Sequence, residues 1–379
     1  MHSVCLIGRH GTTTGASFSS SSSSKVVGFF TFMMASCFLF QMNQAQITLP
    51  NNITIPALIA FGDSIIDAGN NNNLKTLVKC NFPPYGRDFM GGIPTGRFSN
   101  GKVPTDFLVE DLGIKELLPA YLDPTLKPSD LLTGVSFASG ACGYDPLTSQ
   151  MTSVLSLSDQ LNLFREYIRK LKKIAGEERA NSIIAESFYA ICTGSDDIAN
   201  TYFSTLLRSV NYDVPTYTDL MIRSASSFIQ ELYGLGARRI GVLDIPPIGC
   251  VPEQRTLGGG QERECAEKYN QAASLFNTKL SSLINSLNRR LPQSKIVFID
   301  IYQPLLDIIQ YPDSYGFEYV NKGCCGTGRL EVSILCNSLV PQTCQNDSKY
   351  LFWDSYHPSE RAYRFLTTVI LRDNINQFF

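Results

Sequence analysis

The sequence predicts an α/β fold in which helices cover a parallel β-sheet. Short apolar runs rich in β-forming residues alternate along the chain with longer stretches of helical character. Each short run is apolar almost throughout, as a strand buried on both faces should be. Polar residues and glycines collect directly after these runs, at the strand ends where open α/β sheets place their sites.

Five strands and five helices follow from this pattern. The expected strands are Ala57–Phe61, Gly134–Ala138, Phe188–Cys192, Arg239–Leu243 and Lys295–Ile299. The expected helices lie around Val103–Asp111, Ser158–Ile174, Thr218–Leu235, Cys265–Asn288 and Ser359–Ile375. The segments at the strand ends read FGDS, FASG, TGSDD, DIPP and IDIY. Turn formation explains part of this polarity, and the remainder marks this edge of the sheet for closer inspection.

The composition is that of a globular protein and excludes a disordered or fibrous chain. Of the 379 residues, 44% are hydrophobic and 17% are charged, and the net charge is −2. Such a chain is long enough to bury a substantial core. No block of Lys and Arg provides a footprint for nucleic acid or for an anionic membrane surface. We therefore expect a small or uncharged partner and no nucleic acid.

The first 45 residues have the layout of a signal peptide. A serine run, Ser19–Ser24, precedes the apolar stretch Val26–Phe40, which is shorter than the roughly 20 residues that a membrane span needs. Ala45 is a suitable cleavage point, although a membrane anchor is the alternative reading. Residues 46–379 contain no repeat, no linker and no second stretch long enough to span a membrane, and we expect a single domain there.

Cysteines and sequons indicate secretion into an oxidising compartment. Two of the 11 cysteines precede residue 46, and most of the other nine should pair. An odd number leaves at least one free thiol, for which Cys192 in its apolar run is the candidate. Asn52 and Asn346 begin N-glycosylation triplets. Four cysteines crowd together near the C-terminus, and disulfides are favoured over zinc because they lack C-x2-C spacing and a nearby histidine: Cys324, Cys325, Cys336 and Cys344.

His357 is the candidate general base. The chain has three histidines, and His2 and His10 precede residue 46, so any His-dependent chemistry of the remaining chain must use His357. Asp354 stands three residues earlier in WDSYHPSE and could reach Nδ1 of the imidazole. Pro358 disfavours helix at His357, which places the pair on a loop ahead of the last helix.

Ser64 is the candidate nucleophile. It directly follows the first expected strand in AFGDSIIDAGN, where Gly62 allows a tight turn and a helix can begin beyond the serine. A strand, a sharp turn and a helix N-terminus would present Oγ and a backbone N–H together. The G-x-S-x-G elbow is absent from the chain, which argues against the α/β-hydrolase fold.

Taken together, the motifs resemble the plant GDSL esterase/lipase family of the SGNH hydrolase superfamily. FGDSIIDAGNNNN, GVSFASGACG, CTGSDDIANTYF and FWDSYHPSE resemble the four family blocks in their order, and GSDD is similar to the extracellular-lipase subgroup. The resemblance implies a flavodoxin-like three-layer α/β/α fold. It also implies hydrolysis of carboxylic esters by Ser64, His357 and Asp354, with no metal and no organic cofactor.

Two positions depart from the family pattern. Ser136 stands where the second block usually has Asn, and we interpret that change as structural. The third block implies an oxyanion-hole Asn where this chain has Asp196, and an ionised carboxylate has no hydrogen to donate. Either Asp196 is protonated there, or the hole relies on the N–H groups of Ser64 and Gly140, with Asn200 nearby.

The sequence thus predicts a secreted serine esterase or lipase that acts on small-molecule or lipid esters through an acyl-enzyme. In a plant the location would be the cell wall or apoplast. An acyltransferase that uses the same acyl-enzyme is one alternative, and a non-catalytic secreted lipid-binding protein is another. Four aromatic residues either line an apolar groove after the first helix or belong to the core: Phe82, Tyr85, Phe89 and Phe98.

Overall fold

The computed structural model describes residues 53–339 and 342–379, which belong to one compact unit. The predicted signal peptide and Asn52 lie outside the described residues. None of the helices within these ranges is long and apolar enough to cross a membrane.

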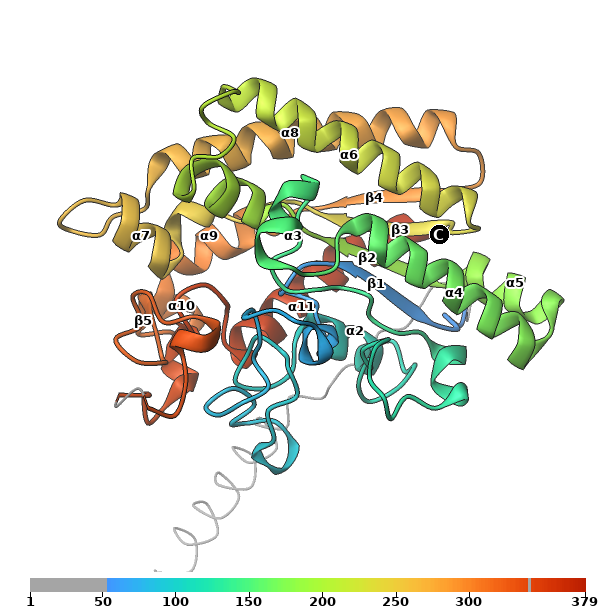
Figure 1. The fold of residues 1–379 in the computed structure, drawn as a ribbon, viewed down its shortest axis with the longest axis horizontal. Coiled ribbons are helices and arrows are strands. Elements are labelled where there is room, and N and C mark those ends of the chain that lie inside the picture. Colours follow the sequence, from blue (N-terminus) through green and yellow to red (C-terminus); the bar gives the residue numbers. More distant parts are fainter. Residues whose placement is uncertain (1–52, 340–341) are drawn as a thin grey trace, which may run out of the picture. The chain divides into compact units, whose positions relative to one another are not determined.

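Four parallel strands form the central sheet in the order β1-β2-β3-β4 (Figure 1). They are β1 (Leu58–Gly62), β2 (Phe188–Cys192), β3 (Arg239–Leu243) and β4 (Lys295–Ile299). Each lies within a residue of its expected range. Leu58 is aligned with Phe188, and Arg239 is aligned with both Phe188 and Lys295, so the carboxyl ends of all four strands share one edge.

The fifth expected strand, Gly134–Ala138, runs beside β1 but pairs only through single bridges. Ser136 bridges Ala60 on one side and Ala120 on the other, and the Phe137 N–H donates to the Ala60 carbonyl at 2.8 Å. Counted in chain order, the five extended segments lie in the spatial order 2-1-3-4-5, which is the flavodoxin-like order. The predicted fold class is confirmed.

Helices cover both faces of the sheet (Figure 1). Along β1, Ile59 and Phe61 join one apolar core, together with residues of α4, α6 and α8. Leu58 and Ala60 point the other way, into a second core with residues of α2 and α11. The longer helices are α2 (Pro104–Asp111), α4 (Leu157–Ala175), α5 (Glu177–Glu186), α6 (Val214–Gly234), α8 (Glu267–Arg290), α9 (Tyr302–Gln310) and α11 (Glu360–Asn374).

The expected helices start and stop where local chemistry dictates. Ser156 caps α4, because its Oγ accepts from the Asp159 N–H at 3.2 Å while the Asp159 carboxylate accepts from the Ser156 N–H at 3.0 Å. Gly176, with φ of 80°, ends α4 and separates it from α5. The sequence reasoning missed α5 and α9, as well as the short helices α3 (Pro146–Thr152), α7 (Pro252–Gly258) and α10 (Pro312–Tyr315).

A small region outside the sheet carries the cysteine-rich segment. It contains a second, two-stranded parallel sheet of β5 (Tyr319–Gly323) and β6 (Tyr350–Phe352), which the sequence reasoning also missed. The four clustered cysteines form disulfides, as predicted. The pairing, which the sequence left open, is Cys324–Cys344 and Cys325–Cys336. Their sulfurs are therefore not available as zinc ligands.

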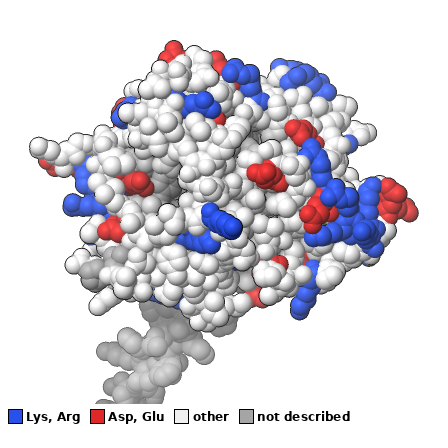
Figure 2. Space-filling model, in the orientation of Figure 1, with Lys and Arg blue, Asp and Glu red and all other residues white. Residues whose placement is uncertain are grey.

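A third disulfide, which the sequence did not indicate, joins Cys250 to Cys265 ahead of α8. Cys192 is buried and free, as expected, and so are Cys80 and Cys142. Figure 2 shows that charged side chains of both signs gather over the end of the molecule that carries α4 and α5, while much of the rest of this face is uncharged.

Candidate active site

A tight turn at the end of β1 presents Ser64. Gly62 has φ of 138°, and a Cβ there would lie 1.8 Å from the Cys192 carbonyl oxygen, so only glycine fits. The Gln160 side chain of α4 clamps this peptide, accepting from the Gly62 N–H at 2.8 Å and donating to its carbonyl at 2.9 Å. The Asp63 N–H then donates to the Cys192 carbonyl at 2.9 Å. Ser64 is thereby held just beyond the carboxyl end of the sheet.

The helix expected directly after Ser64 is absent, so that prediction was wrong. Residues 63–69 form turns and bends, and the next helical element is a short 3-10 turn at Asn70–Asn73. The Asp67 carboxylate takes the N–H groups of Gly69 and Asn70 at 2.8 and 2.7 Å, which competes with helix formation. Among the described residues, the Ser64 N–H has no hydrogen-bond partner, so this donor is free.

His357 lies on the predicted loop between β6 and α11. The Trp353 N–H donates to the His357 carbonyl at 2.8 Å, and Phe352 bridges Pro358 in antiparallel fashion. Ser359 then caps α11, with its Oγ accepting from the Ala362 N–H. Backbone contacts therefore close the loop at its base.

Three side chains form a continuous hydrogen-bonded chain. Nε2 of His357 lies 2.8 Å from Oγ of Ser64, and Nδ1 lies 2.8 Å from Oδ2 and 3.0 Å from Oδ1 of Asp354. All three residues are buried. A hydroxyl, an imidazole and a carboxylate in this order can transfer a proton from the hydroxyl to the ring and stabilise the resulting imidazolium.

Two aromatic residues pack against this chain. The Phe98 ring centroid lies 5.0 Å from that of His357, and the Tyr85 hydroxyl donates to Oδ2 of Asp354 at 2.7 Å. Both are buried and belong to one apolar cluster with Trp353, so the core alternative holds for this pair. The sequence reasoning missed the Tyr85 contact, because 269 residues separate the two partners.

The Gly140 N–H already has a hydrogen-bond acceptor. It donates to Oδ2 of Asp67 at 3.0 Å, whereas the expectation was a donor free for an oxyanion. Burial raises the pKa of Asp67 to about 6. Ser136 in the same block donates to the Ile66 carbonyl at 2.8 Å and accepts from the Ala138 N–H at 3.2 Å, which agrees with a structural interpretation of that departure.

Asp196 lies near the imidazole and lacks a full set of partners. Its Oδ1 accepts from the Asn200 amide at 2.7 Å, and its buried Oδ2 has no hydrogen-bond partner in the described part of the chain. Burial raises the pKa of Asp196 to about 6, while the neighbouring His357 and the Asn200 amide lower it. Such a carboxyl is protonated in mildly acidic solution and is then a donor.

Further carboxyls surround Asp196. Burial raises the pKa of Asp197 and of Glu253 to about 7, and burial together with Asp196 raises that of Asp63. Asp197 accepts from the N–H groups of Tyr144 and Asp145 at 2.7 and 3.0 Å, so it ties the third block to the segment that directly follows the second. No group of three or more His, Cys, Asp or Glu in the described ranges is arranged to hold a metal ion.

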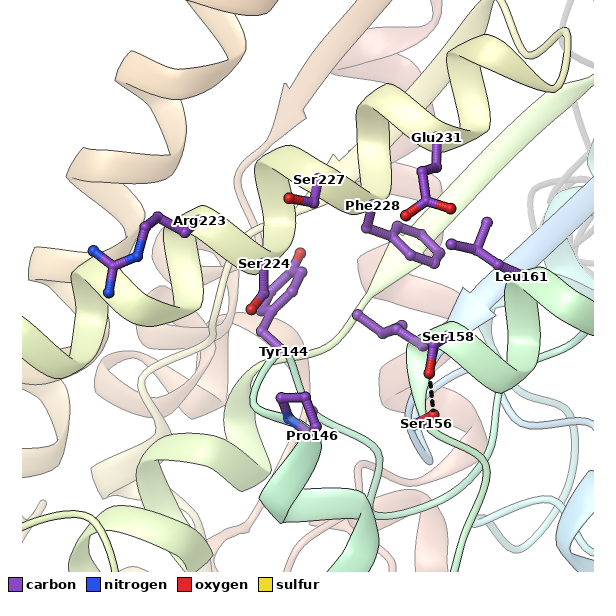
Figure 3. Close-up of a pocket in the computed structure, with 12 residues that line it drawn as sticks. Tyr144, Pro146, Ser156, Ser158, Leu161, Arg223, Ser224, Ser227, Phe228 and Glu231 are labelled. Carbon is purple, nitrogen blue, oxygen red and sulfur yellow. Dashed lines mark hydrogen bonds between the residues drawn. The ribbon is translucent and has the colours of Figure 1, made fainter.

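A separate cavity of about 290 Å³ opens between α6 and the α3–α4 segment (Figure 3). None of the catalytic candidates lines it. Its wall includes serines and apolar side chains together with Arg223 and Glu231, and its Tyr144 belongs to the segment that Asp197 binds.

Asn346, the candidate glycosylation residue within the described ranges, is exposed, and its Oδ1 accepts from the Ser348 hydroxyl at 2.6 Å.

Comparison with known proteins points to one family over most of the chain. The family model described as GDSL-like lipase/acylhydrolase matches residues 58–370. The chain is similar to GDSL esterase/lipase EXL3 of Arabidopsis thaliana, with 57% identity over 332 residues, covering 88% of this chain and 91% of the relative. It is also similar to GDSL esterase/lipase EXL2 of the same plant, with 52% identity over 338 residues, covering 86% and 89%.

Proposed function

The chain belongs to the GDSL-like lipase/acylhydrolase family and is a carboxylic ester hydrolase, and we propose that Ser64, His357 and Asp354 are its catalytic residues. The observation that carries this proposal is the hydrogen-bonded chain from Oγ of Ser64 through His357 to Asp354, with both links at 2.8 Å. Small-molecule esters are the substrate class, and lipid esters are the proposed subclass.

The chemistry follows from the order of the three groups. Ser64 Oγ attacks the ester carbonyl carbon while Nε2 of His357 takes the hydroxyl proton, and Asp354 stabilises the imidazolium. The tetrahedral intermediate then expels the alcohol, which receives the proton from His357. Water attacks the acyl-enzyme by the same route, and its proton returns through His357 to Ser64.

The negative charge on the tetrahedral oxygen needs donors on the far side of Ser64. We propose the Ser64 N–H as the first donor, since it has no partner within the described residues. The Gly140 N–H can contribute only by sharing its bond to Asp67, and protonation of Asp67 weakens that competing acceptor. Protonated Asp196 is the proposed third donor.

We propose secretion, with cleavage of residues 1–45 and glycans on Asn52 and Asn346. Three disulfides fit an oxidising compartment, and because the relatives come from a plant, we propose the cell wall or apoplast as the destination. Expression in a secreting host should give a chain that begins near Gln46 and migrates faster after glycosidase treatment. Retention of residues 1–45 in the cell-associated protein would overturn the proposal.

Pre-steady-state hydrolysis of a p-nitrophenyl ester tests the catalytic proposal. The acyl-enzyme predicts a burst of p-nitrophenol equal to the enzyme concentration, followed by slower turnover. Adding a competing alcohol measures how the acyl group divides between water and alcohol. Predominant ester formation at low alcohol concentration would favour the acyltransferase instead. Absence of both burst and turnover with p-nitrophenyl esters from acetate to palmitate would contradict the catalytic assignment.

A further inference from the structure

Tyr85 contacts the proposed triad from a distant part of the chain. The residue is 1% exposed. Its oxygen accepts a hydrogen bond from the Ser333 N–H at 2.8 Å, and its own hydrogen is directed to Oδ2 of Asp354 at 2.7 Å. Because the N–H can only donate, the Tyr85 hydroxyl is fixed as the donor to the carboxylate.

The contact falls on the carboxylate oxygen closest to the imidazole. Oδ1 of Asp354 accepts the backbone N–H groups of Tyr356 at 2.8 Å and His357 at 2.6 Å. Oδ2 has Tyr85 and, at 2.8 Å, Nδ1 of His357. The backbone donors hold one oxygen, and Tyr85 is the side chain that holds the other. Together they prevent the carboxylate from rotating away from the ring.

Ser333 is itself held in place at some conformational cost. It is buried and has φ of 50°, a left-handed conformation that non-glycine residues seldom adopt. Its Oγ accepts from the Lys79 N–H at 2.9 Å and lies within 3.1 Å of the Leu77 carbonyl, and the Cys325–Cys336 disulfide closes the loop that contains it. The strained conformation points the Ser333 N–H at Tyr85.

The ring of Tyr85 has little freedom to move. It packs edge-on against Phe82 and Trp353, with centroid distances of 6.0 and 6.4 Å. The same apolar cluster contains Cys80 and three cysteines of the two C-terminal disulfides. The hydroxyl is therefore positioned by covalent and packing constraints that reach back to the cysteine-rich region.

We propose that Tyr85 is a positioning residue for ester hydrolysis: its hydroxyl, oriented by the Ser333 N–H, holds Asp354 in line with His357. This inference rests on the proposed function, since it assigns Tyr85 a role only if Asp354 and His357 act. Tyr85 is not assigned a contact with the substrate. It acts through Asp354, by sharing and directing the negative charge.

A pH signature separates this role from simple packing. The other titratable groups that face Asp354 or His357 include Asp196, Glu253, Cys80, Tyr363 and Tyr356. Of these groups, the Cys80 thiol interacts with the Tyr85 hydroxyl. Burial raises the pKa of that thiol well above its usual range, so it stays neutral across the acid limb. Loss of the hydroxyl concentrates the charge of Asp354 on its bond to the imidazole, which favours the imidazolium. The acid limb of kcat/KM, which reports protonation of the base, should then move to higher pH.

The test compares Tyr85→Phe with Tyr363→Phe. Tyr363 is also buried and faces Asp354, but its hydroxyl has no partner among the described residues, so it is a matched control for losing a buried oxygen. Tyr85→Phe should lower kcat by about ten- to a hundredfold with little change in KM and move the acid limb to higher pH. Tyr363→Phe should do neither.

Two further variants make the outcome decisive. Ser333→Ala retains the N–H but loses the ties to residues 77 and 79, and it should give a smaller change in the same direction. Asp354→Ala tests the underlying triad. Loss of activity in Asp354→Ala without a pH shift in Tyr85→Phe would overturn the Tyr85 proposal alone. Near-normal turnover of Asp354→Ala would instead overturn the triad assignment.

Discussion

The buried side chains near Ser64 fall into two groups, which we call the His357 side (His357 and Asp354) and the Asp196 side (Asp196 and Asp67). Both pairs are buried at the carboxyl edge of the sheet. The imidazole and the Asp354 carboxylate have partners at both ends, including two backbone N–H groups and the Tyr85 hydroxyl. By contrast, Asp196 keeps one buried oxygen without a partner in the described ranges, and Asp67 occupies the Gly140 N–H.

The difference shows where the protein is organised for proton transfer and where it is sensitive to pH. The His357 side is fixed before substrate arrives, because both oxygens of Asp354 accept hydrogen bonds from buried donors besides the imidazole. The Asp196 side concentrates carboxyls whose pKa is raised to about 6 or 7 by burial. Its hydrogen-bonding capacity therefore depends on protonation.

The largest expected effect comes from removing the nucleophile or the general base. Ser64→Ala and His357→Ala should each lower kcat by roughly 10⁴- to 10⁶-fold, since the two residues act as a unit. The double variant should be scarcely worse than either single variant. Steady-state kinetics with a p-nitrophenyl ester measures all three. Multiplicative losses in the double variant would show that the two side chains act independently.

Asp196→Asn should give the Asp196 side a hydrogen-bond donor that, like the donors of the His357 side, does not depend on protonation. The amide is a permanent donor, so kcat at pH 8 should rise by about 10²- to 10³-fold, the usual contribution of one oxyanion-hole donor. Removing a negative charge that faces His357 should also move the acid limb of the pH profile to lower pH. An unchanged pH profile would exclude Asp196 from the hole and leave the charge to backbone N–H groups.

Removing the Cys325–Cys336 disulfide should loosen the positioning of Tyr85 and Asp354, although neither cysteine contacts the imidazole. The Cys325→Ser/Cys336→Ser variant should lose about 2–4 kcal/mol of unfolding free energy. It should also shift the acid limb as Tyr85→Phe does, because the disulfide closes the loop that carries Ser333. Denaturant unfolding and a pH–rate profile measure the two effects. Lost stability with an unshifted profile would separate the disulfide from the catalytic residues.

The smallest expected effect is on stability against pH. A carboxyl whose pKa is raised on folding contributes stability that is fully present below its unfolded pKa of about 3.9 and is lost as pH rises through the folded value. That window is set by the folded-state pKa values, which are about 6 for Asp67 and Asp196 and about 7 for Asp197. The unfolding free energy should therefore fall between pH 5 and pH 8.

Asp196→Asn provides the control for this trend. Its share of the fall is about 1–2 kcal/mol, so the variant should show a shallower pH dependence than the natural chain. Denaturant unfolding at both pH values measures the difference. Equal slopes for the two proteins would mean that Asp196 keeps an ordinary pKa in the folded state.

The sequence predicted the sheet, the catalytic candidates and the C-terminal disulfides because each depends on local pattern. Buried strands are apolar runs, and His357 is the single histidine after residue 45. The hydrogen bond between Tyr85 and Asp354 could not be predicted from the sequence, since nothing in a local pattern encodes a contact across 269 positions. The expected helix after Ser64 failed because Asp67 binds the backbone of the following residues.

The most direct test of the central assignment is covalent labelling with a p-nitrophenyl organophosphonate, followed by peptide mapping. We expect one phosphonate per chain, attached to Ser64, with labelling greatly slowed in His357→Ala because the imidazole no longer removes the hydroxyl proton. Labelling of a different serine, or labelling of Ser64 at an unchanged rate in His357→Ala, would contradict it.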